Sequence, residues 1–205
     1  MTSSWTLYRP EGLSPEFTKI MLTAELCDIK LEVKQVDGVE KGLAGVGKEV
    51  ITLPDGRFAV LQMPQGQLFG AQTISRFLAK SRPALGIHGE TFHEQGEVDS
   101  WLEFLQNELE VAVSGMIHEA ARAPEERRRE VDEEAKRDIV AAFRVLDNHL
   151  HRNMYLVGHH PTLADVAAQA AMIHVKKLAP ELLAPEQHRS LNRWFATLEA
   201  QRTSA

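Results

Sequence analysis

The 205-residue chain contains a single cysteine, Cys27, so no disulfide can form within it. This cysteine usage is typical of a reducing compartment. The sequence also has no apolar run near the roughly 20 residues that cross a bilayer, and its N-terminus has no signal-peptide pattern. A formal charge of −6 gives the chain no general positive field to attract nucleic acid. We therefore expect a cytoplasmic protein.

The sequence lacks the usual signatures of a metal site. Its nine histidines include two close pairs, His149 with His151 and His159 with His160. Neither pair has the spacing of the His-Glu-x-x-His zinc motif, and one cysteine cannot supply a set of thiolates. We expect no metal and no cofactor, and we interpret His159 and His160 as part of a surface turn.

A glycine-rich segment, residues 42–49, nearly matches a phosphate-binding loop and reads GLAGVGKE. That motif requires Ser or Thr after the lysine to hold Mg²⁺, and it requires a helix directly afterwards. Glu49 occupies the Ser/Thr position and would repel phosphate, and residues 50–54 favour an extended or irregular conformation. We interpret this segment as a glycine-rich loop.

The most informative stretch is residues 155–166, which read YLVGHHPTLADV and precede a run of small apolar residues. Thr162 is a favoured N-cap, and Asp165 can accept a hydrogen bond from the Thr162 backbone N–H. Pro161 disfavours helix before the cap. Because a helix that is apolar on nearly every side is central in its domain, this stretch predicts a buried, capped helix.

The remaining patterns divide the chain into two predicted domains. Residues 1–81 show strand patterns, a helix that opens at Ser14 and Pro15, and a helix from residue 71 to 80. This order, βαβ–loop–ββα, predicts a mixed α/β domain.

Residues 91–205 show helical periodicity, with one helix over 97–122, a next helix whose first turn holds Pro124, and a final helix through 191–198. They predict an all-α domain, and residues 82–86 form the predicted linker. The predicted strands are residues 5–8, 31–33, 58–61 and 67–69.

These patterns resemble the glutathione-transferase superfamily. The string that begins at Tyr155, followed by Thr162-Leu-Ala-Asp165, is similar to the core helix of its C-terminal domain. The order of elements before it is similar to a thioredoxin-like N-terminal domain. The resemblance covers nearly the whole chain and implies a thioredoxin-like α/β domain followed by an all-α domain.

The resemblance also implies a degenerate glutathione cleft at Ser14, Ala59, Val60, Gly70 and Ala71. Active members have a cis proline where this chain has Ala59, and a non-proline cis bond costs about 2.5–4 kcal/mol, so we expect a trans bond. Active members also hold the γ-glutamyl end with a Glu/Gln-Ser pair, which Gly70 and Ala71 replace. Ser14 lies where many members keep a thiolate-steadying hydroxyl, but capping explains it. We therefore expect no catalytic residue.

A chain that keeps the fold but has lost the ligand site is expected to act as a scaffold. The resemblance to domains of translation proteins therefore implies a non-catalytic protein–protein assembly domain of the translation apparatus. The strings at 58–62, 66–69, 73–77, 100–104 and 191–198 look most like domains that scaffold aminoacyl-tRNA synthetases or their tRNA-binding cofactor. The string NRWF at 192–195 also resembles the N-terminal domain of elongation factor 1 gamma, which would bind exchange-factor subunits. A divergent glutathione transferase that uses Ser14 is the third alternative.

The resemblance implies two surfaces for partners, which would be synthetases, other glutathione-transferase-like domains or a second copy of the chain. One surface lies near the end of the first domain, and the other on the capped helix and the loop after it. Because the chain is acidic, we expect it to meet tRNA only through an appended domain. The candidate residues are Gln72, Ser75, Arg76 and Lys80 on the first surface, and Gln169, His174, Lys176, Lys177 and Arg193 on the second.

Overall fold

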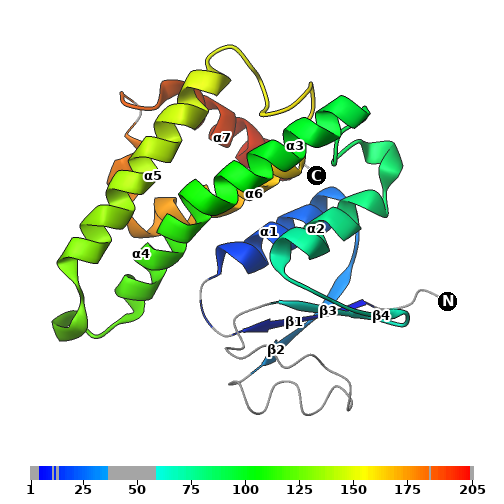
Figure 1. Ribbon diagram of the computed structural model, residues 1–205, viewed down its shortest axis with the longest axis horizontal. Helices are drawn as coiled ribbons and strands as arrows, with labels where there is room; N and C mark the ends of the chain where they lie inside the picture. Colours follow the sequence, from blue (N-terminus) through cyan, green and yellow to red (C-terminus); the bar gives the residue numbers. More distant parts are fainter. Residues whose placement is uncertain (1–4, 11, 13, 37–58, 185, 204–205) are drawn as a thin grey trace. The chain divides into compact units, whose positions relative to one another are not determined.

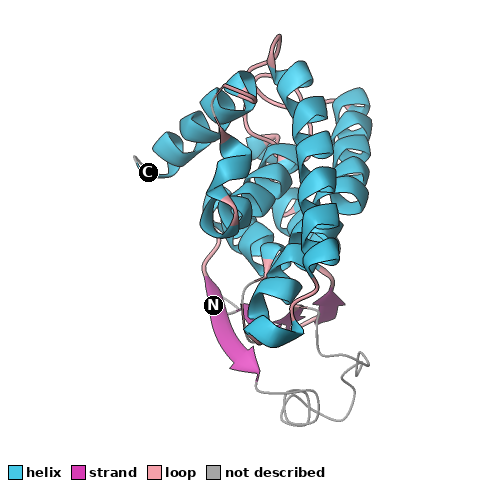
Figure 2. Cartoon of the chain, turned by 90° about the vertical axis from the view of Figure 1, so that its left-hand side faces the viewer, coloured by secondary structure: helices cyan, strands magenta, loops and turns pink. Residues whose placement is uncertain are grey.

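The computed structural model describes residues 5–10, 12, 14–36, 59–184 and 186–203. The chain divides into two compact units, residues 1–85 and 86–205. The first combines strands and helices and the second is helical (Figures 1 and 2), so the predicted fold class is confirmed. In the described ranges, no helix has the length and hydropathy needed to span a bilayer.

The first unit is built on a four-stranded mixed sheet with strand order β2-β1-β3-β4. β1 pairs in parallel with β2 and antiparallel with β3, and β3 pairs antiparallel with β4. Figure 1 shows α1 and α2 together on one side of this sheet. The elements are β1 (Trp5–Pro10), α1 (Pro15–Leu26), β2 (Leu31–Val36), β3 (Val60–Met63), β4 (Gly66–Phe69) and α2 (Ala71–Lys80).

The core of the first unit lies between the sheet and its two helices. Leu7 of β1 and Leu61 of β3 are fully buried, with Ile20 of α1 and Ile74 and Leu78 of α2. The strand predicted over 58–61 is observed as Val60–Met63, and residue 58 lies outside the described residues. The shift arises because β3 pairs on both sides, with β1 and with β4, up to the turn at residues 64–65.

The second unit consists of packed helices, and two of its predicted boundaries are wrong. The helix predicted over 97–122 begins at Phe92, after a capping box of Thr91 and Glu94, and a π-helical segment at Leu105–Glu110 interrupts it. Pro124 lies in a separate 3-10 turn rather than in the next helix. The helices are α3 (Phe92–Phe104), α4 (Val111–Ala121), α5 (Arg129–Leu150), α6 (Leu163–Leu178) and α7 (Arg189–Thr203).

Helix α6 is the central element of the second unit. Twelve of its sixteen residues are buried, and it packs against α3 and α4. Its capping box joins Thr162 to Asp165, as the sequence predicts. The small side chains at Ala167, Ala168 and Ala171 allow neighbouring helices to approach closely, because they add little volume between the backbones.

Candidate functional site

The residues of the predicted glutathione cleft lie in the first unit. Ser14 has an extended backbone before α1, and its Oγ accepts a hydrogen bond from the Phe17 N–H at 3.1 Å. The Ser14 carbonyl accepts a further bond from the Thr18 hydroxyl at 3.0 Å. Ser14 is therefore the N-cap of α1, and this role accounts for its hydroxyl without a ligand.

The other cleft residues offer no side chain that could hold a charged tripeptide. Ala59, Val60 and Ala71 are buried and apolar, and the Gly70 N–H donates to the Ala59 carbonyl at 3.2 Å. Gly70 has a φ of 83°, a conformation that glycine adopts without the steric cost it carries for other residues. The peptide bond before Ala59 joins it to Phe58, outside the described residues, so its trans form stays a prediction. The glycine-rich segment 42–49 also lies outside them.

Two further kinds of chemistry find little support in the structure. Burial raises the pKa of the Cys27 thiol to about 11, so this thiol is protonated near neutral pH and is a poor nucleophile. Among the described residues, no group of three or more His, Cys, Asp or Glu side chains is arranged to hold a metal ion.

The best-organised polar site in the second unit is centred on Asp165, which is fully buried. Its Oδ2 accepts from the Thr162 N–H and hydroxyl, at 2.9 and 3.0 Å. Its Oδ1 accepts from the Leu156 N–H at 3.0 Å and from the Trp194 indole N–H at 2.8 Å. Burial raises the pKa of Asp165, and these four bonds act in the opposite direction because they favour the carboxylate. The site joins α6, the loop before it and α7.

The structure separates the partner candidates into buried and exposed residues. Ser75 of α2 and Gln169 and His174 of α6 are at most 4% exposed, so they offer no surface to another protein. On α2, Lys80 is exposed, and Gln72 and Arg76 are half-buried. The first predicted surface is therefore reduced to Gln72, Arg76 and Lys80, which lie along the length of α2.

The exposed candidates of the second surface also make contacts inside the chain. Lys176 pairs with Glu199 at 2.7 Å and lies 5.4 Å from the centre of the Phe195 ring. Arg193 donates to the Leu150 carbonyl at 2.6 Å. Lys177 is exposed, next to Lys176 at the end of α6. Lys177 is thus the candidate at which a change of charge disturbs the fewest contacts shown by the structure.

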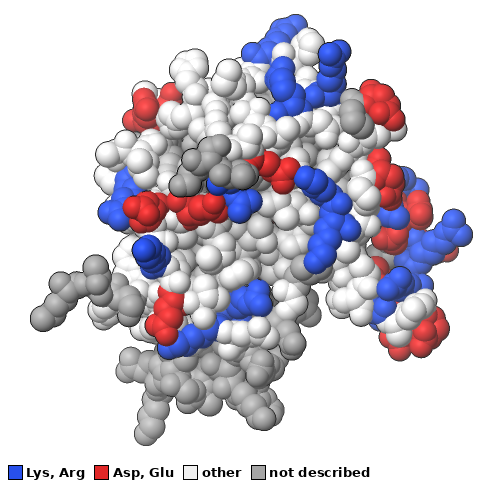
Figure 3. Space-filling view, turned by 180° about the vertical axis from the view of Figure 1, so that it is seen from behind, with Lys and Arg blue, Asp and Glu red and all other residues white. Residues whose placement is uncertain are grey.

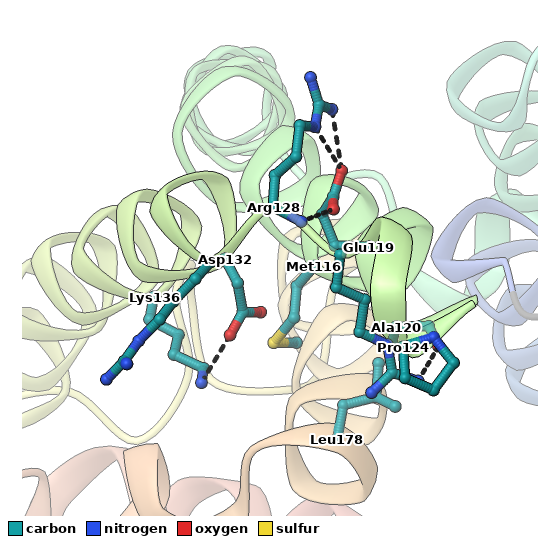
Figure 4. Close-up of a pocket in the computed structure, with 10 residues that line it drawn as sticks. Met116, Glu119, Ala120, Pro124, Arg128, Asp132, Lys136 and Leu178 are labelled. Atoms are coloured by element: carbon teal, nitrogen blue, oxygen red, sulfur yellow. Dashed lines mark hydrogen bonds and ion pairs between the residues drawn. The ribbon is translucent and has the colours of Figure 1, made fainter. Parts of the chain in front are cut away.

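Residues of α4, α5 and α6 line a pocket of about 410 Å³ that the sequence patterns did not predict (Figure 4). At its edge the Glu119 side chain, only 3% exposed, accepts from the Arg128 N–H at 2.9 Å and from the Arg128 guanidinium at 2.8 Å. These hydrogen bonds lower the pKa of Glu119. The run Arg127–Arg129 is a signal of this pocket in the sequence, but its interleaved charges are equally typical of an exposed helical face. The lining residues are Met116, Glu119, Ala120, Pro124, Arg127, Arg128, Arg129, Asp132, Lys136 and Leu178.

Sequence relatives of the chain are elongation factors 1-gamma. It is 29% identical over 154 residues to elongation factor 1-gamma 2 of Oryza sativa subsp. japonica, a match that covers 72% of this chain and 35% of the rice protein. It is 29% identical over 170 residues to elongation factor 1-gamma of Trypanosoma cruzi, covering 82% and 39%. The chain thus spans little more than a third of the length of these relatives, and the homology is distant.

Solved glutathione transferases share the fold. Poplar glutathione transferase F1 is 14% identical with a TM-score of 0.80, and the match covers 100% of both chains. A glutathione transferase from Methylobacillus flagellatus, solved with glutathione bound, is 21% identical with a TM-score of 0.77, covering 95% and 94%. The family model described as "Glutathione S-transferase, C-terminal domain" matches residues 98–202, more than half of the chain. The chain therefore belongs to the family of proteins with a glutathione S-transferase C-terminal domain.

Proposed function

We propose that the chain is a non-catalytic assembly domain of the translation apparatus, in the cytoplasm, with a role like that of the corresponding part of elongation factor 1-gamma. The observation that carries this proposal is the similarity to elongation factors 1-gamma over 72–82% of the chain. This similarity supports the elongation-factor alternative more than the synthetase scaffold that the short sequence strings favoured. Binding to exchange-factor subunits is the activity that this proposal predicts.

The chemistry of the cleft supports a role without catalysis. The positions that correspond to the glutathione anchors are Ala59, Gly70 and Ala71, which have neither a carboxylate nor a hydroxyl. Ser14 has such a hydroxyl, but it accepts the Phe17 N–H as a helix cap. A ligand with two carboxylates and an ammonium group needs charged or hydrogen-bonding partners that these residues do not supply.

A binding experiment tests the partner. The whole chain is immobilised and presented separately with purified elongation factor 1 exchange subunits and with methionyl-tRNA synthetase from the same organism. We expect saturable binding of an exchange subunit. Binding of the synthetase alone would replace the proposal with the synthetase scaffold, and binding of neither would overturn both.

Two charge reversals locate the surface in the same experiment. Lys177→Glu changes the end of α6, and Lys80→Glu changes the end of α2, and both lysines are exposed. Each variant is the matched control for the other, because each changes the net charge by the same amount. We expect one to weaken binding and the other to leave it unchanged, with both thermal unfolding curves like that of the parent chain.

A second experiment tests the enzymatic alternative. We expect no retention on glutathione-agarose and no conjugation of a chlorinated aromatic acceptor. If conjugation occurs, Ser14→Ala and Ser14→Asp separate its causes, because Asp preserves a helix cap but lacks the hydroxyl. Thr91→Ala, which removes the cap of α3, controls for lost stability. Conjugation abolished in both Ser14 variants and kept in Thr91→Ala would overturn the non-catalytic assignment.

A further inference from the structure

The pocket between α4, α5 and α6 has an excess of positive charge in a chain of net charge −6. Four cationic side chains line it, and two carboxylates, Glu119 and Asp132, leave an excess of two positive charges. Arg128 is turned toward Glu119, and Lys136 pairs with Asp132 at 2.8 Å (Figure 4). The internal carboxylates therefore neutralise only part of this charge.

Of the two remaining cations, Arg127 is positioned by hydrogen bonds that leave donors free for a ligand, and Arg129 has its donors free among the described residues. Arg127 donates through Nε to the Arg122 carbonyl at 3.2 Å and through Nη2 to the Ala120 carbonyl at 3.0 Å. These bonds anchor its guanidinium at the end of α4 and leave other N–H groups. Arg129 is exposed, and the part of the chain that the structure describes gives its guanidinium no hydrogen-bond or ion-pair partner. Guanidinium groups match the geometry of phosphate oxygens.

The other side of the pocket is apolar. Met116, Ala120, Pro124 and Leu178 contribute carbon and sulfur surface, and Figure 4 shows Met116, Leu178 and the stem of Lys136 directed toward one space. A volume of about 410 Å³ is within the range of small-molecule sites. The pocket thus combines a cationic rim with an apolar wall.

We propose that this pocket binds a small organic phosphate monoester. Its phosphate would lie against Arg127 and Arg129, and its organic part against Met116, Leu178 and the stem of Lys136. A phosphate monoester has a charge near −2 at pH 7, which matches the excess positive charge of the lining. The proposal is independent of the assembly role, because none of these residues is among the candidates named for the two partner surfaces.

Phenyl phosphate is the probe, titrated into the whole chain and followed by calorimetry and by NMR of ¹³C-methyl methionine. The chain has six methionines, and only Met116 lines the pocket. We expect saturable one-to-one binding that shifts the Met116 methyl signal and leaves the signals of the other described methionines in place. Phenol and inorganic phosphate, which each lack half of the ligand, are expected to bind more weakly.

Two variants with the same change of charge give the control. Arg129→Gln removes a lining cation, and we expect it to weaken binding about tenfold, the loss of one charge-assisted hydrogen bond. Arg137→Gln removes an exposed charge on the same helix outside the lining, and we expect a change of less than about twofold. No saturable binding, an unshifted Met116 signal, equal effects of the two variants, or inorganic phosphate binding as tightly as phenyl phosphate would each overturn the proposal.

Discussion

Asp165 joins three segments of the second unit through one side chain. Its carboxylate accepts hydrogen bonds from Thr162, Leu156 and Trp194, so the cap of α6, the preceding loop and α7 share one acceptor. The loss of a buried acceptor leaves each of these donors without a partner, and such groups are costly to bury. The importance of Asp165 therefore exceeds that of an ordinary helix cap, which contributes about 1 kcal/mol.

We predict that Asp165→Asn lowers the free energy of unfolding by about 2–4 kcal/mol. The substitution replaces one carboxylate oxygen with an NH₂ group, which cannot accept the hydrogen bonds that the surrounding N–H and O–H groups donate. Urea unfolding followed by circular dichroism measures this change. Asp138→Asn, at an exposed position of α5, is the control and should change stability by less than about 0.5 kcal/mol. Equal effects of the two substitutions would contradict the role given to Asp165.

Glu119 stabilises the connection between α4 and α5 through its bonds to Arg128. Because these bonds lower the pKa of Glu119 in the folded chain, its contribution is present above the unfolded pKa, near 4.5, and is lost as the pH falls through the folded pKa. We predict that Glu119→Gln is less stable than the parent chain at pH 7. The difference should narrow below about pH 4.5 in urea unfolding curves measured from pH 7 to pH 3. Glu134→Gln, at an exposed position of α5, should show no such narrowing.

Helix α7 is held to α5 by contacts near its N-terminus. The Asp147 carboxylate of α5 accepts the Leu191 N–H at 2.9 Å. His188, directly before α7, is 2% exposed and packs edge-on against Phe143 with ring centroids 5.7 Å apart. Among the described residues, neither ring nitrogen of His188 has a hydrogen-bond partner. A proton added there would place a charge in an apolar contact.

We predict that protonation of His188 destabilises the attachment of α7 at acid pH. Burial lowers the pKa of His188 below its ordinary value of 6.5; Asp147 raises it and Arg144 lowers it further. The unfolded chain therefore binds more protons in this window, and stability should fall as the pH decreases from about 7 through the folded pKa. His188→Phe should reduce this slope in thermal unfolding, and His93→Gln, at an exposed position, should not. A slope unchanged in His188→Phe would show that another group titrates.

The whole molecule has both signs of charge on its surface. On the face that Figure 3 shows, Lys and Arg side chains are interspersed with Asp and Glu and with uncharged residues. The formal charge of the chain is −6. Affinity for nucleic acid depends mainly on cations that neutralise phosphates, and an acidic chain has a net charge that opposes this attraction.

We predict that the chain alone does not shift tRNA in a gel assay at about 150 mM salt. The same assay at lower salt is the control, because weak nonspecific contacts strengthen as screening decreases. A tRNA complex at the higher salt, weakened by further salt, would contradict this expectation and would assign a direct tRNA role to the domain.

Much of the fold could be predicted because its signals are local. The alternation in β1 and β2, the Ser14-Pro15 opening of α1 and the capped start of α6 each depend on residues close in sequence. The π-helical segment at Leu105–Glu110 could not be predicted in this way, since its residues keep nearly helical periodicity. The start of α5 at Arg129 could not be predicted either, because the backbone N–H of Arg128 donates to the side chain of Glu119, on the preceding helix.

Residue type and short spacing were enough to predict the fold class and the cap of α6, because these signals are local. The tertiary structure decided which predicted surface residues are buried, namely Ser75, Gln169 and His174. It also decided that Trp194 donates to Asp165 across 29 residues, and that the charged start of α5 borders a pocket. These features depend on contacts between distant segments, and one sequence does not specify which segments meet.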